Sequence, residues 1–347
     1  MTLREIAKIA GVAASTVSLV LNNKPGVHPD TRAHVKKILE ENGYVLQKAT
    51  VPSIPAHGEI KFVRYKSANH INERNEDFFS KLLNGAEQEA RAKGLDLGII
   101  NIELSELPGL LKAFENQSSK IVGVIFLASE LERENLDLFR TFSLPVVFLD
   151  RQLDDFNLNT ISTCNIAGAY EAVKYLYDLG HRKIGLLRGQ TDIGGLRERA
   201  VGYRRALRDL NITYNDDYVV DIDLLYETAA VQMAEYLKSA EDLPTAFFAG
   251  NDIIAAGCIR GLQQCGFNVP EDISVIGFDD GFMSTFVTPQ LSTMHIPSEK
   301  IGAMAVDRIL QIITGSKDII KSSVGTSLIA RESTAPPNNK GSVAVTI

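Results

Sequence analysis

A chain of 347 residues is longer than one ordinary domain and predicts two or three domains. With 45% apolar and 23% charged residues the composition is that of a water-soluble globular protein, and no apolar run approaches the roughly 18 residues of a membrane span. The N-terminal stretch carries charges within a helical pattern, unlike a signal peptide, so we expect a cytoplasmic protein. The cysteines lack the spacing of a metal or redox site and fit free thiols; they are Cys164, Cys258 and Cys265.

The net charge of −7 is unevenly distributed along the chain. In the first fifty residues lysine and arginine outnumber aspartate and glutamate, whereas the remainder is strongly acidic. A polyanion would therefore be attracted to the N-terminal part rather than to the rest of the protein.

The first fifty residues predict three short helices. Thr2 can cap a first helix whose apolar residues recur at helical spacing, and Gly11 ends it. A second helix is expected over residues 14–21, and a third runs from Pro29 to Gly43. Two short helices joined by a turn that begins with glycine are typical of a helix-turn-helix, whose second helix enters the major groove of DNA.

The residues of this segment carry a family resemblance. The sequence TLREIAKIAGVAASTVSLVLNNKPGVHPDTRAHVKKILEENGY resembles the headpiece of the LacI/GalR (lactose-repressor) family of bacterial transcription regulators. The matching pieces are I-A-x-x-A-G-V, T-V-S-x-V-L-N and V-x-x-x-T-R, in that order. The resemblance implies a homodimer whose two headpieces bind a palindromic double-stranded operator.

The resemblance also assigns the contacts to DNA. Positions that reach base edges in the family hold Ala14, Ser15 and Leu19 here, all short or apolar, and Ala13 replaces a capping serine. We therefore expect an operator unlike those of relatives. The candidate phosphate contacts are Thr16, Ser18, Asn22 and Arg32, and the whole expected DNA-binding set is Thr2, Ala14, Ser15, Thr16, Ser18, Leu19, Asn22 and Arg32.

A break between the headpiece and the body follows the third helix. Pro52, Pro55 and a glycine within this stretch rule out a continuous helix. Members of the family have a short hinge helix here, whose leucine wedges into the minor groove, but this chain has Ser53 at the wedge position. We therefore expect an atypical linker, which argues against a kinked operator.

From residue 60 onward, apolar strands alternate with helical patterns, which predicts parallel sheets with crossover helices. The succession occurs twice, over 60–160 and over 163–288, so we expect two lobes with a cleft between them. Strands are expected at 121–127, 145–149, 184–187, 246–249 and 275–278, and helices at 79–93, 166–179, 199–210, 228–239 and 253–265.

The family resemblance extends over this region, in stretches such as RERAVGYRRAL and ISVIGFDD. It implies an all-α helix-turn-helix headpiece followed by a two-lobed α/β domain like a periplasmic binding protein, with two doubly wound parallel sheets. It also implies that the chain crosses between the lobes three times, near 161, 291 and 322. The expected domains are the headpiece at 1–46, the linker at 47–59, an N-terminal lobe at 60–161 plus 292–322, and a C-terminal lobe at 162–291 plus 323–347.

Ligands of open α/β sheets bind beyond the carboxyl ends of the strands. Asp150, Asn251 and Asp279 lie at or just beyond the ends of apolar runs, and these three residues and Arg199 match ligand positions of the family. Paired carboxylate oxygens accept hydrogen bonds from neighbouring hydroxyls while arginine donates to oxygen. We therefore expect a sugar or a sugar phosphate as the effector, with a nucleoside as the alternative.

Two further residues complete the expected effector site. Tyr226 is a candidate stacking wall for a sugar face, and His70 belongs to 61–79, the stretch least like the family, at an expected lobe edge. Asp252 and Asp280 are expected mainly to cap helices, with ligand contact as the alternative.

These observations favour a ligand-responsive transcription regulator, a repressor of a sugar-utilisation operon, which needs no cofactor, metal or membrane. The alternatives are a sugar-processing enzyme or a sugar-binding protein that uses the same cleft. The carboxylates at strand ends could form an acid/base pair, but the sequence has no GxGxxG after a strand, no P-loop and no GxSxG. The histidines show no metal-ligand spacing, and His181 is expected to be structural. A transport-binding protein would need export and no DNA-binding headpiece.

Overall fold

The computed structural model describes residues 2–21, 26–44, 58–66, 76–129, 131, 133–153, 155–191 and 193–338. The chain divides into two compact units, Met1–Ser53 and Ile54–Ile347, which are described separately below. Within the described ranges, no helix combines the length and the apolar character that crossing a membrane requires.

The first unit contains the three expected helices, α1 (Leu3–Ile9), α2 (Ala14–Leu21) and α3 (Pro29–Glu41). Thr2 and Glu5 form a capping box, in which the main-chain amide of Thr2 donates to Glu5 Oε2 at 2.7 Å. Gly11 takes a positive φ of 64°, as the turn of a helix-turn-helix requires. The three helices enclose one small apolar core, whose fully or nearly buried members are Ile6, Ala7, Ala10, Val17, Val20, Val35, Ile38 and Leu39.

The expectation that the linker forms no hinge helix falls on residues 47–57, which lie outside the described residues, as do Asn22 and His70.

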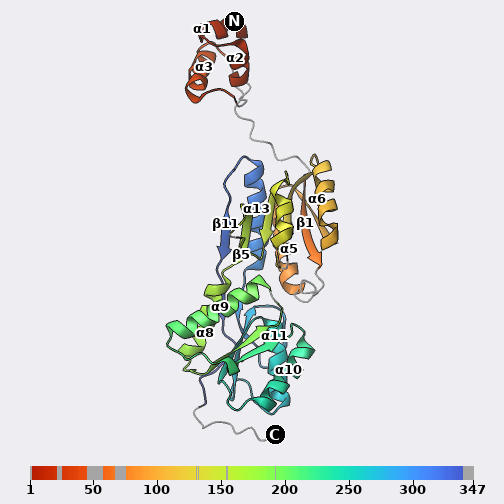
Figure 1. The fold of residues 1–347 in the computed structure, drawn as a ribbon, viewed down its shortest axis with the longest axis vertical. Helices are drawn as coiled ribbons and strands as arrows, with labels where there is room; N and C mark the ends of the chain where they lie inside the picture. Colours follow the sequence, from red (N-terminus) through yellow and green to blue (C-terminus); the bar gives the residue numbers. More distant parts are fainter. Residues whose placement is uncertain are drawn as a thin grey trace. The chain divides into compact units, whose positions relative to one another are not determined.

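The second unit contains two sheets, each flanked by helices on both faces (Figure 1). The first sheet has the strand order β11-β5-β4-β3-β1-β2 and is parallel throughout its described pairs. Its strands are β1 (Glu59–Lys66), β2 (Asp96–Glu103), β3 (Ile121–Leu127), β4 (Val146–Leu149), β5 (Asn159–Thr163) and β11 (Lys321–Val324).

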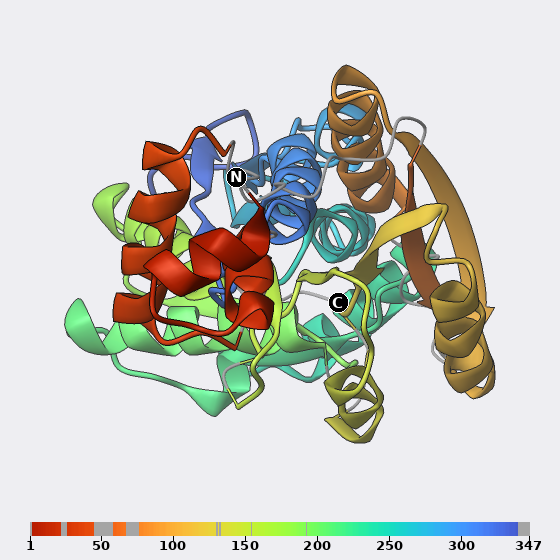
Figure 2. The same cartoon turned by 90° about the horizontal axis from the view of Figure 1, so that it is seen from above.

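Alternate residues of the first sheet face different helices. Phe62 packs in one apolar cluster with α5 (Glu76–Ala92) and α13 (Ser298–Ile313), whereas the adjacent Val63 packs in another with α6 (Leu107–Asn116). Helices α5 and α13 lie against each other (Figures 1 and 2). Shorter helical segments are η1 (Leu104–Glu106), α7 (Arg133–Leu136) and η2 (Asp137–Arg140).

The second sheet has the order β12-β10-β9-β8-β6-β7, and only its edge strand β12 runs antiparallel among the described pairs. Its strands are β6 (Ile184–Gly189), β7 (Val219–Ile222), β8 (Ala246–Ala249), β9 (Ser274–Asp279), β10 (Ser292–His295) and β12 (Ser327–Ile329). Its helical segments are α8 (Asn165–Asp178), α9 (Gly194–Asp209), η3 (Asp216–Tyr218), α10 (Tyr226–Ser239), α11 (Asp252–Gln264) and α12 (Met283–Phe286). The two-lobed fold with doubly wound, mostly parallel sheets is therefore confirmed.

Among the described residues, the chain crosses between the sheets at three places, each a few residues beyond its expected position. β5 ends at Thr163 and α8 begins at Asn165, β10 ends at His295, and β11 ends at Val324. The displacement near 291 arises because β10 pairs with β9 and so belongs to the second lobe. Two crossings touch each other, since the main-chain amide of Cys164 donates to the carbonyl of Val324 at 2.8 Å.

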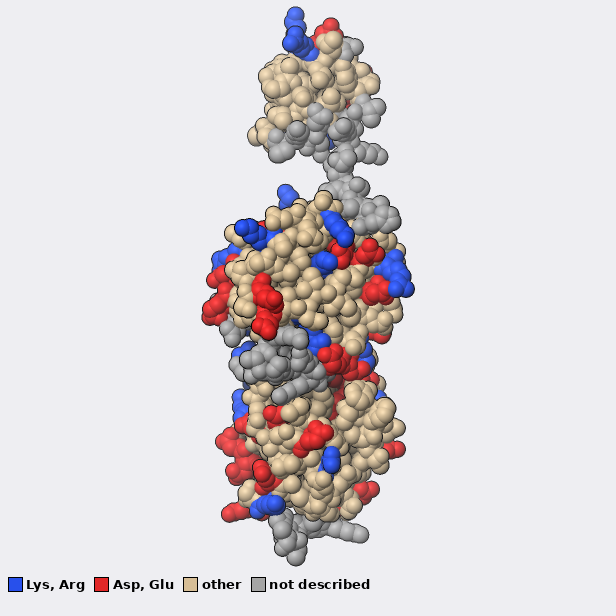
Figure 3. Space-filling view, turned by 90° about the vertical axis from the view of Figure 1, so that its right-hand side faces the viewer, with Lys and Arg blue, Asp and Glu red and all other residues tan. Residues whose placement is uncertain are grey.

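Acidic and basic side chains are interspersed over both lobes on the face shown in Figure 3.

His181 is 1% exposed and hydrogen-bonds Thr245 Oγ1 at 2.8 Å and the carbonyl of Ala335 at 2.9 Å, which confirms its structural role. Burial lowers the pKa of His181, although the Ala335 carbonyl works in the opposite direction.

Candidate functional site

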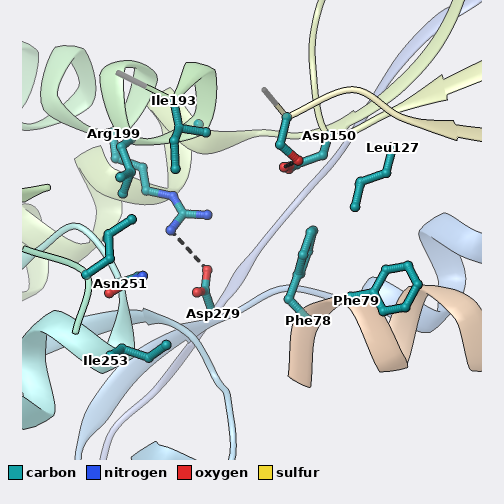
Figure 4. A pocket seen from close by; sticks show the side chains of 13 residues that line it. Phe78, Phe79, Leu127, Asp150, Ile193, Arg199, Asn251, Ile253 and Asp279 are labelled. Atoms are coloured by element: carbon teal, nitrogen blue, oxygen red, sulfur yellow. Dashed lines mark hydrogen bonds and ion pairs between the residues drawn. The ribbon is translucent and has the colours of Figure 1, made fainter. Parts of the chain in front are cut away.

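A cavity lies between the two lobes at the carboxyl ends of their strands, and about 660 Å³ is open within it and at its mouth. The first lobe contributes a mostly apolar wall: Phe78, Phe79, Leu127, Ser129 and Asp150. The second lobe contributes the larger share: Ile193, Gly195, Leu196, Arg199, Leu224, Asn251, Ile253 and Asp279. Four of the expected effector residues, Asp150, Arg199, Asn251 and Asp279, thus meet in one cavity (Figure 4).

Arg199 is held on several sides. It projects from α9, is 7% exposed, and donates from Nε to Asn165 Oδ1 at 3.0 Å and from a terminal nitrogen to the carbonyl of Gly250 at 2.7 Å. The same terminal nitrogen lies 2.9 Å from Asp279 Oδ1, and the guanidinium carbon lies 3.9 Å from the ring centre of Phe278. Figure 4 shows the guanidinium projecting into the cavity between Asp279 and Asp150. The arginine is therefore oriented before any ligand arrives.

Asn165 is a residue that the sequence analysis missed. It is 2% exposed, it is the first residue of α8, and its Nδ2 donates to Glu198 Oε2 at 2.9 Å while its Oδ1 accepts from Arg199. Both ends of the amide are thus used in orienting the arginine. Its place directly after the first crossing between the lobes was the available signal in the sequence.

Asp150 follows β4 with a φ of 65°, and its Oδ2 accepts a hydrogen bond of 2.6 Å from the hydroxyl of Ser129. Burial raises the pKa of Asp150 to about 6, although the Ser129 hydrogen bond and the charge of Arg199 oppose this. Asp150 therefore changes its charge near pH 6.

The backbone around Asp279 is also unusual. Asp279 and Asp280 have φ values of 122° and 55°, and non-glycine residues with positive φ concentrate at functional sites. The Asp280 carboxylate accepts a hydrogen bond of 2.6 Å from the Arg331 guanidinium at Oδ1, and His295 Nδ1 lies 3.0 Å from its Oδ2. Burial alone would raise its pKa, but these two partners lower the pKa of Asp280 overall.

The expectation that Asp252 caps the next helix was wrong. Asn251, not Asp252, is the N-cap of α11, where its Oδ1 accepts from the amide of Ile254 at 2.9 Å. Asp252 is buried and accepts from Thr293 Oγ1 at 2.5 Å and from the amide of Gly281 at 2.8 Å. Burial and the nearby charge of Asp279 raise its pKa well above the ordinary value. Asn251 therefore combines a structural cap with a place in the cavity lining.

Tyr226 does not belong to the cavity lining. It begins α10, and its ring centre lies 5.4 Å from the guanidinium carbon of Arg260 on the neighbouring α11. The aromatic side chains of the lining are instead Phe78 and Phe79, of which Phe79 was expected to begin a helix and Phe78 lies in 61–79, the stretch least like the family.

Five of the expected DNA contacts lie on α2, namely Ala14, Ser15, Thr16, Ser18 and Leu19. Ala14 and Ser15 are exposed, while Thr16, Ser18 and Leu19 are half-buried, and Val17 and Val20 on the opposite face are buried. Thr2 caps α1, and Arg32 lies half-buried in α3. The exposed residues at the start of α2, Ala14 and Ser15, therefore have short side chains.

Both units of the chain resemble known protein families. Residues 2–47 match the family described as bacterial regulatory proteins, lacI family, and residues 173–334 match a periplasmic binding protein-like domain. The HTH-type transcriptional repressor PurR of Aliivibrio salmonicida is 32% identical over 315 residues, which span 90% of this chain and 92% of that protein.

Two solved structures resemble almost the whole chain. One is a complex of the transcriptional regulator CelR with cellobiose, with 27% identity and a TM-score of 0.71 over 96% of this chain and 99% of that one. The other is the lac repressor dimer bound to operator and the anti-inducer ONPF, with 25% identity and a TM-score of 0.69 over the same shares of the two chains.

Proposed function

We propose, from the premise that this chain belongs to the lacI family of bacterial regulatory proteins, that it represses transcription by binding an operator and responds to a small molecule. The observation that carries the proposal is the meeting of Asp150, Arg199, Asn251 and Asp279 in one cavity of a chain that begins with a helix-turn-helix. Such a molecule changes DNA affinity only to the extent that it binds two lobe arrangements with different affinities.

The DNA-binding half of the proposal places α2 in the major groove. Ala14 and Ser15 are the exposed residues at its start, and Leu19 follows one turn later. Such short side chains offer methyl contacts and single hydrogen bonds rather than bidentate base recognition, so phosphate contacts by Thr16, Ser18, Asn22 and Arg32 would supply much of the affinity. A homodimer binding a palindromic operator follows from two identical headpieces.

The effector half of the proposal is a neutral molecule rich in hydroxyl groups, that is, a saccharide. Among the described lining residues, two carboxylates face one guanidinium, and Arg199 already pairs with Asp279. Within the described part of this lining, a phosphate group would meet Asp150 and find no cation beyond the already paired Arg199, which disfavours a sugar phosphate. Hydroxyls, by contrast, can donate to both carboxylates while the sugar face lies against the apolar wall. The relative that was solved with cellobiose supports the same class, and control of a sugar-utilisation operon would follow.

The enzyme and transport alternatives have no support from the relatives. The protein from Aliivibrio salmonicida that matches nine-tenths of this chain is a transcriptional repressor, and the two solved relatives are a transcriptional regulator and a repressor. The carboxylates of the cavity are therefore assigned to ligand binding rather than to acid/base catalysis.

A thermal-shift screen of the purified protein tests the effector class, because a ligand that binds the folded state raises its unfolding temperature. The panel contains cellobiose, ribose, glucose, glucose 6-phosphate, ribose 5-phosphate, adenosine and guanosine. We expect a shift with a neutral sugar, no shift with its phosphate, and loss of the shift in Asp279→Ala. A shift confined to a phosphate or a nucleoside overturns the saccharide proposal, and a shift that survives in Asp279→Ala overturns the site.

Genome-wide footprinting tests the DNA-binding half independently. We expect protection of a small number of palindromic sequences upstream of sugar-utilisation genes, and a loss of protection in Ser15→Asp, which adds a negative charge to the exposed face of α2. Protection without sequence preference contradicts the proposal.

A further inference from the structure

The second lobe touches α5 of the first lobe through main-chain atoms. Lys81 Nζ donates to the carbonyl oxygen of Asp280 at 2.9 Å, and the amide of Phe282 donates to Asp77 Oδ2 at 3.2 Å. The sequence alone indicates no role for Asp77 or Lys81.

Asp77 and Lys81 lie one helical turn apart and act as a pair. Their charged groups are 2.9 Å apart, and their side chains are 26% and 34% exposed. The pair offers one acceptor and one donor to a single segment, residues 280–282, so it contacts that segment at two points rather than one. Gly281 lies between these points, and a Cβ added there would come within 3.3 Å of Asp77 Oδ2.

The segment that this pair contacts is itself firmly held by the second lobe. Asp280 binds Arg331 and His295, and the amide of Gly281 donates to the buried Asp252. Movement of 280–282 relative to the rest of its lobe is therefore restricted. Separation of the lobes at this point must break the contacts of Asp77 and Lys81 instead.

The contact borders the effector cavity from both lobes. On α5, Phe78 and Phe79 lie between Asp77 and Lys81 and line the cavity, and Asp279, which also lines it, directly precedes the segment that the pair contacts. The two hydrogen bonds thus fix how the aromatic wall of the first lobe faces the aspartate of the second.

From this geometry we propose that Asp77 and Lys81 are positioning residues that form a latch, which holds the lobes closed and sets Asp279 opposite Phe78 and Phe79. The latch rests on the proposed function only in treating this cavity as the effector site. It shifts the balance between open and closed lobes without touching the effector. A molecule that binds the closed arrangement more tightly than the open one works with the latch.

The test measures lobe separation in the full chain without effector or DNA. One spin label is attached to the native exposed Cys265 of the second lobe and another to Gln88→Cys on α5, in a Cys164→Ala background. Labelled protein is diluted with unlabelled protein, so that distances between the two labels of one chain dominate the double electron–electron resonance signal.

In Lys81→Met and in Asp77→Ala we expect the population at the wild-type distance to fall about three- to tenfold relative to a longer distance, as expected for the loss of one or two hydrogen bonds. Asp77→Asn keeps an acceptor for the Phe282 amide and should retain most of the wild-type population. Arg91→Met is the matched control, because Arg91 pairs with Glu87 on the same helix at the same spacing.

Distance distributions of Lys81→Met and Asp77→Ala that superimpose on the wild type overturn the latch, and so does an equal change in Arg91→Met. Because no effector enters the measurement, this outcome is separate from a failure of the saccharide screen.

Discussion

Burial raises the pKa of Asp150 to about 6, and this has a consequence for stability. The unfolded chain loses this proton near the ordinary pKa of about 4, whereas the folded protein keeps it until about pH 6. The charge of Asp150 therefore opposes folding, fully above pH 6 and progressively less as the pH falls towards 4. A buried carboxylate whose charge opposes folding is consistent with a ligand-binding role for Asp150.

Asp150→Asn should stabilise the ligand-free protein at pH 8 by about 3 kcal/mol, since the two pKa values differ by about two units and each unit is worth about 1.4 kcal/mol. The gain should vanish by about pH 4. Urea unfolding at a series of pH values measures it. Asp137→Asn, at an exposed ion pair with Arg140, serves as the control, and a gain that does not depend on pH would contradict the account.

Residues of the site differ in how far the sequence reveals them. Asp150, Asn251 and Asp279 could be predicted because strand ends are the binding edge of an α/β sheet. Phe78 could not, because it lies before the expected start of the helix at residue 79, in the stretch least like the family, and the sequence does not show which part of the other lobe it faces. The prediction that Tyr226 lines the cavity was wrong for a related reason. Tyr226 follows the lining residue Leu224 by two positions in the sequence, but its ring packs beside Arg260 of α11.

At the scale of elements, the apolar runs predicted the buried strands well, and β3 and β8 have the expected bounds. The crossing that the family resemblance placed near 291 lies beyond His295, because the residue pattern of a strand does not show which sheet it joins. Ser292–His295 has the same pattern in either lobe, and only its pairing with β9 assigns it to the second. Tertiary pairing, not local preference, decides such boundaries.

The crossing of α5 and α13 depends on two glycines whose role the sequence does not show. A Cβ added at Gly302 would lie 1.9 Å from the carbonyl oxygen of Leu82, and one added at Gly85 would lie 1.8 Å from that of Glu299. These distances are far below van der Waals contact, so the helices approach this closely only because both positions lack a side chain. Since α5 also carries Phe78 and the latch residues, this packing fixes one wall of the cavity.

Gly302→Ala should lower the free energy of unfolding by about 2 kcal/mol or more, because forced separation of the helices outweighs the gain of about 1 kcal/mol from helix propensity. Gly109→Ala is the matched control, since this glycine of α6 is exposed and nothing lies within 4 Å of an added Cβ. We expect the control to stabilise slightly. Denaturant unfolding compares the two, and a harmless Gly302→Ala would show that the helices part easily.

At the scale of the whole molecule, the distribution of buried apolar residues predicts how the chain unfolds. Among the described residues, the buried apolar side chains of the first unit form a small cluster of their own. In the second unit, one cluster includes Phe62 and Ile125 of the first sheet together with Phe248 and Phe278 of the second. The two lobes therefore share a continuous core despite having separate sheets, and we expect them to unfold as one cooperative unit.

Calorimetry should accordingly show two transitions rather than three, a small one for the helical unit and a large one for both lobes. Val35→Ala, which truncates a fully buried side chain of α3, should lower or abolish the small transition and leave the large one in place. A neutral sugar that binds the cavity should raise only the large transition, because a ligand stabilises the unit that holds its site. Separate transitions for the two lobes would show that the shared core is too weak to couple them, and the latch would then be the main connection between the walls of the cavity.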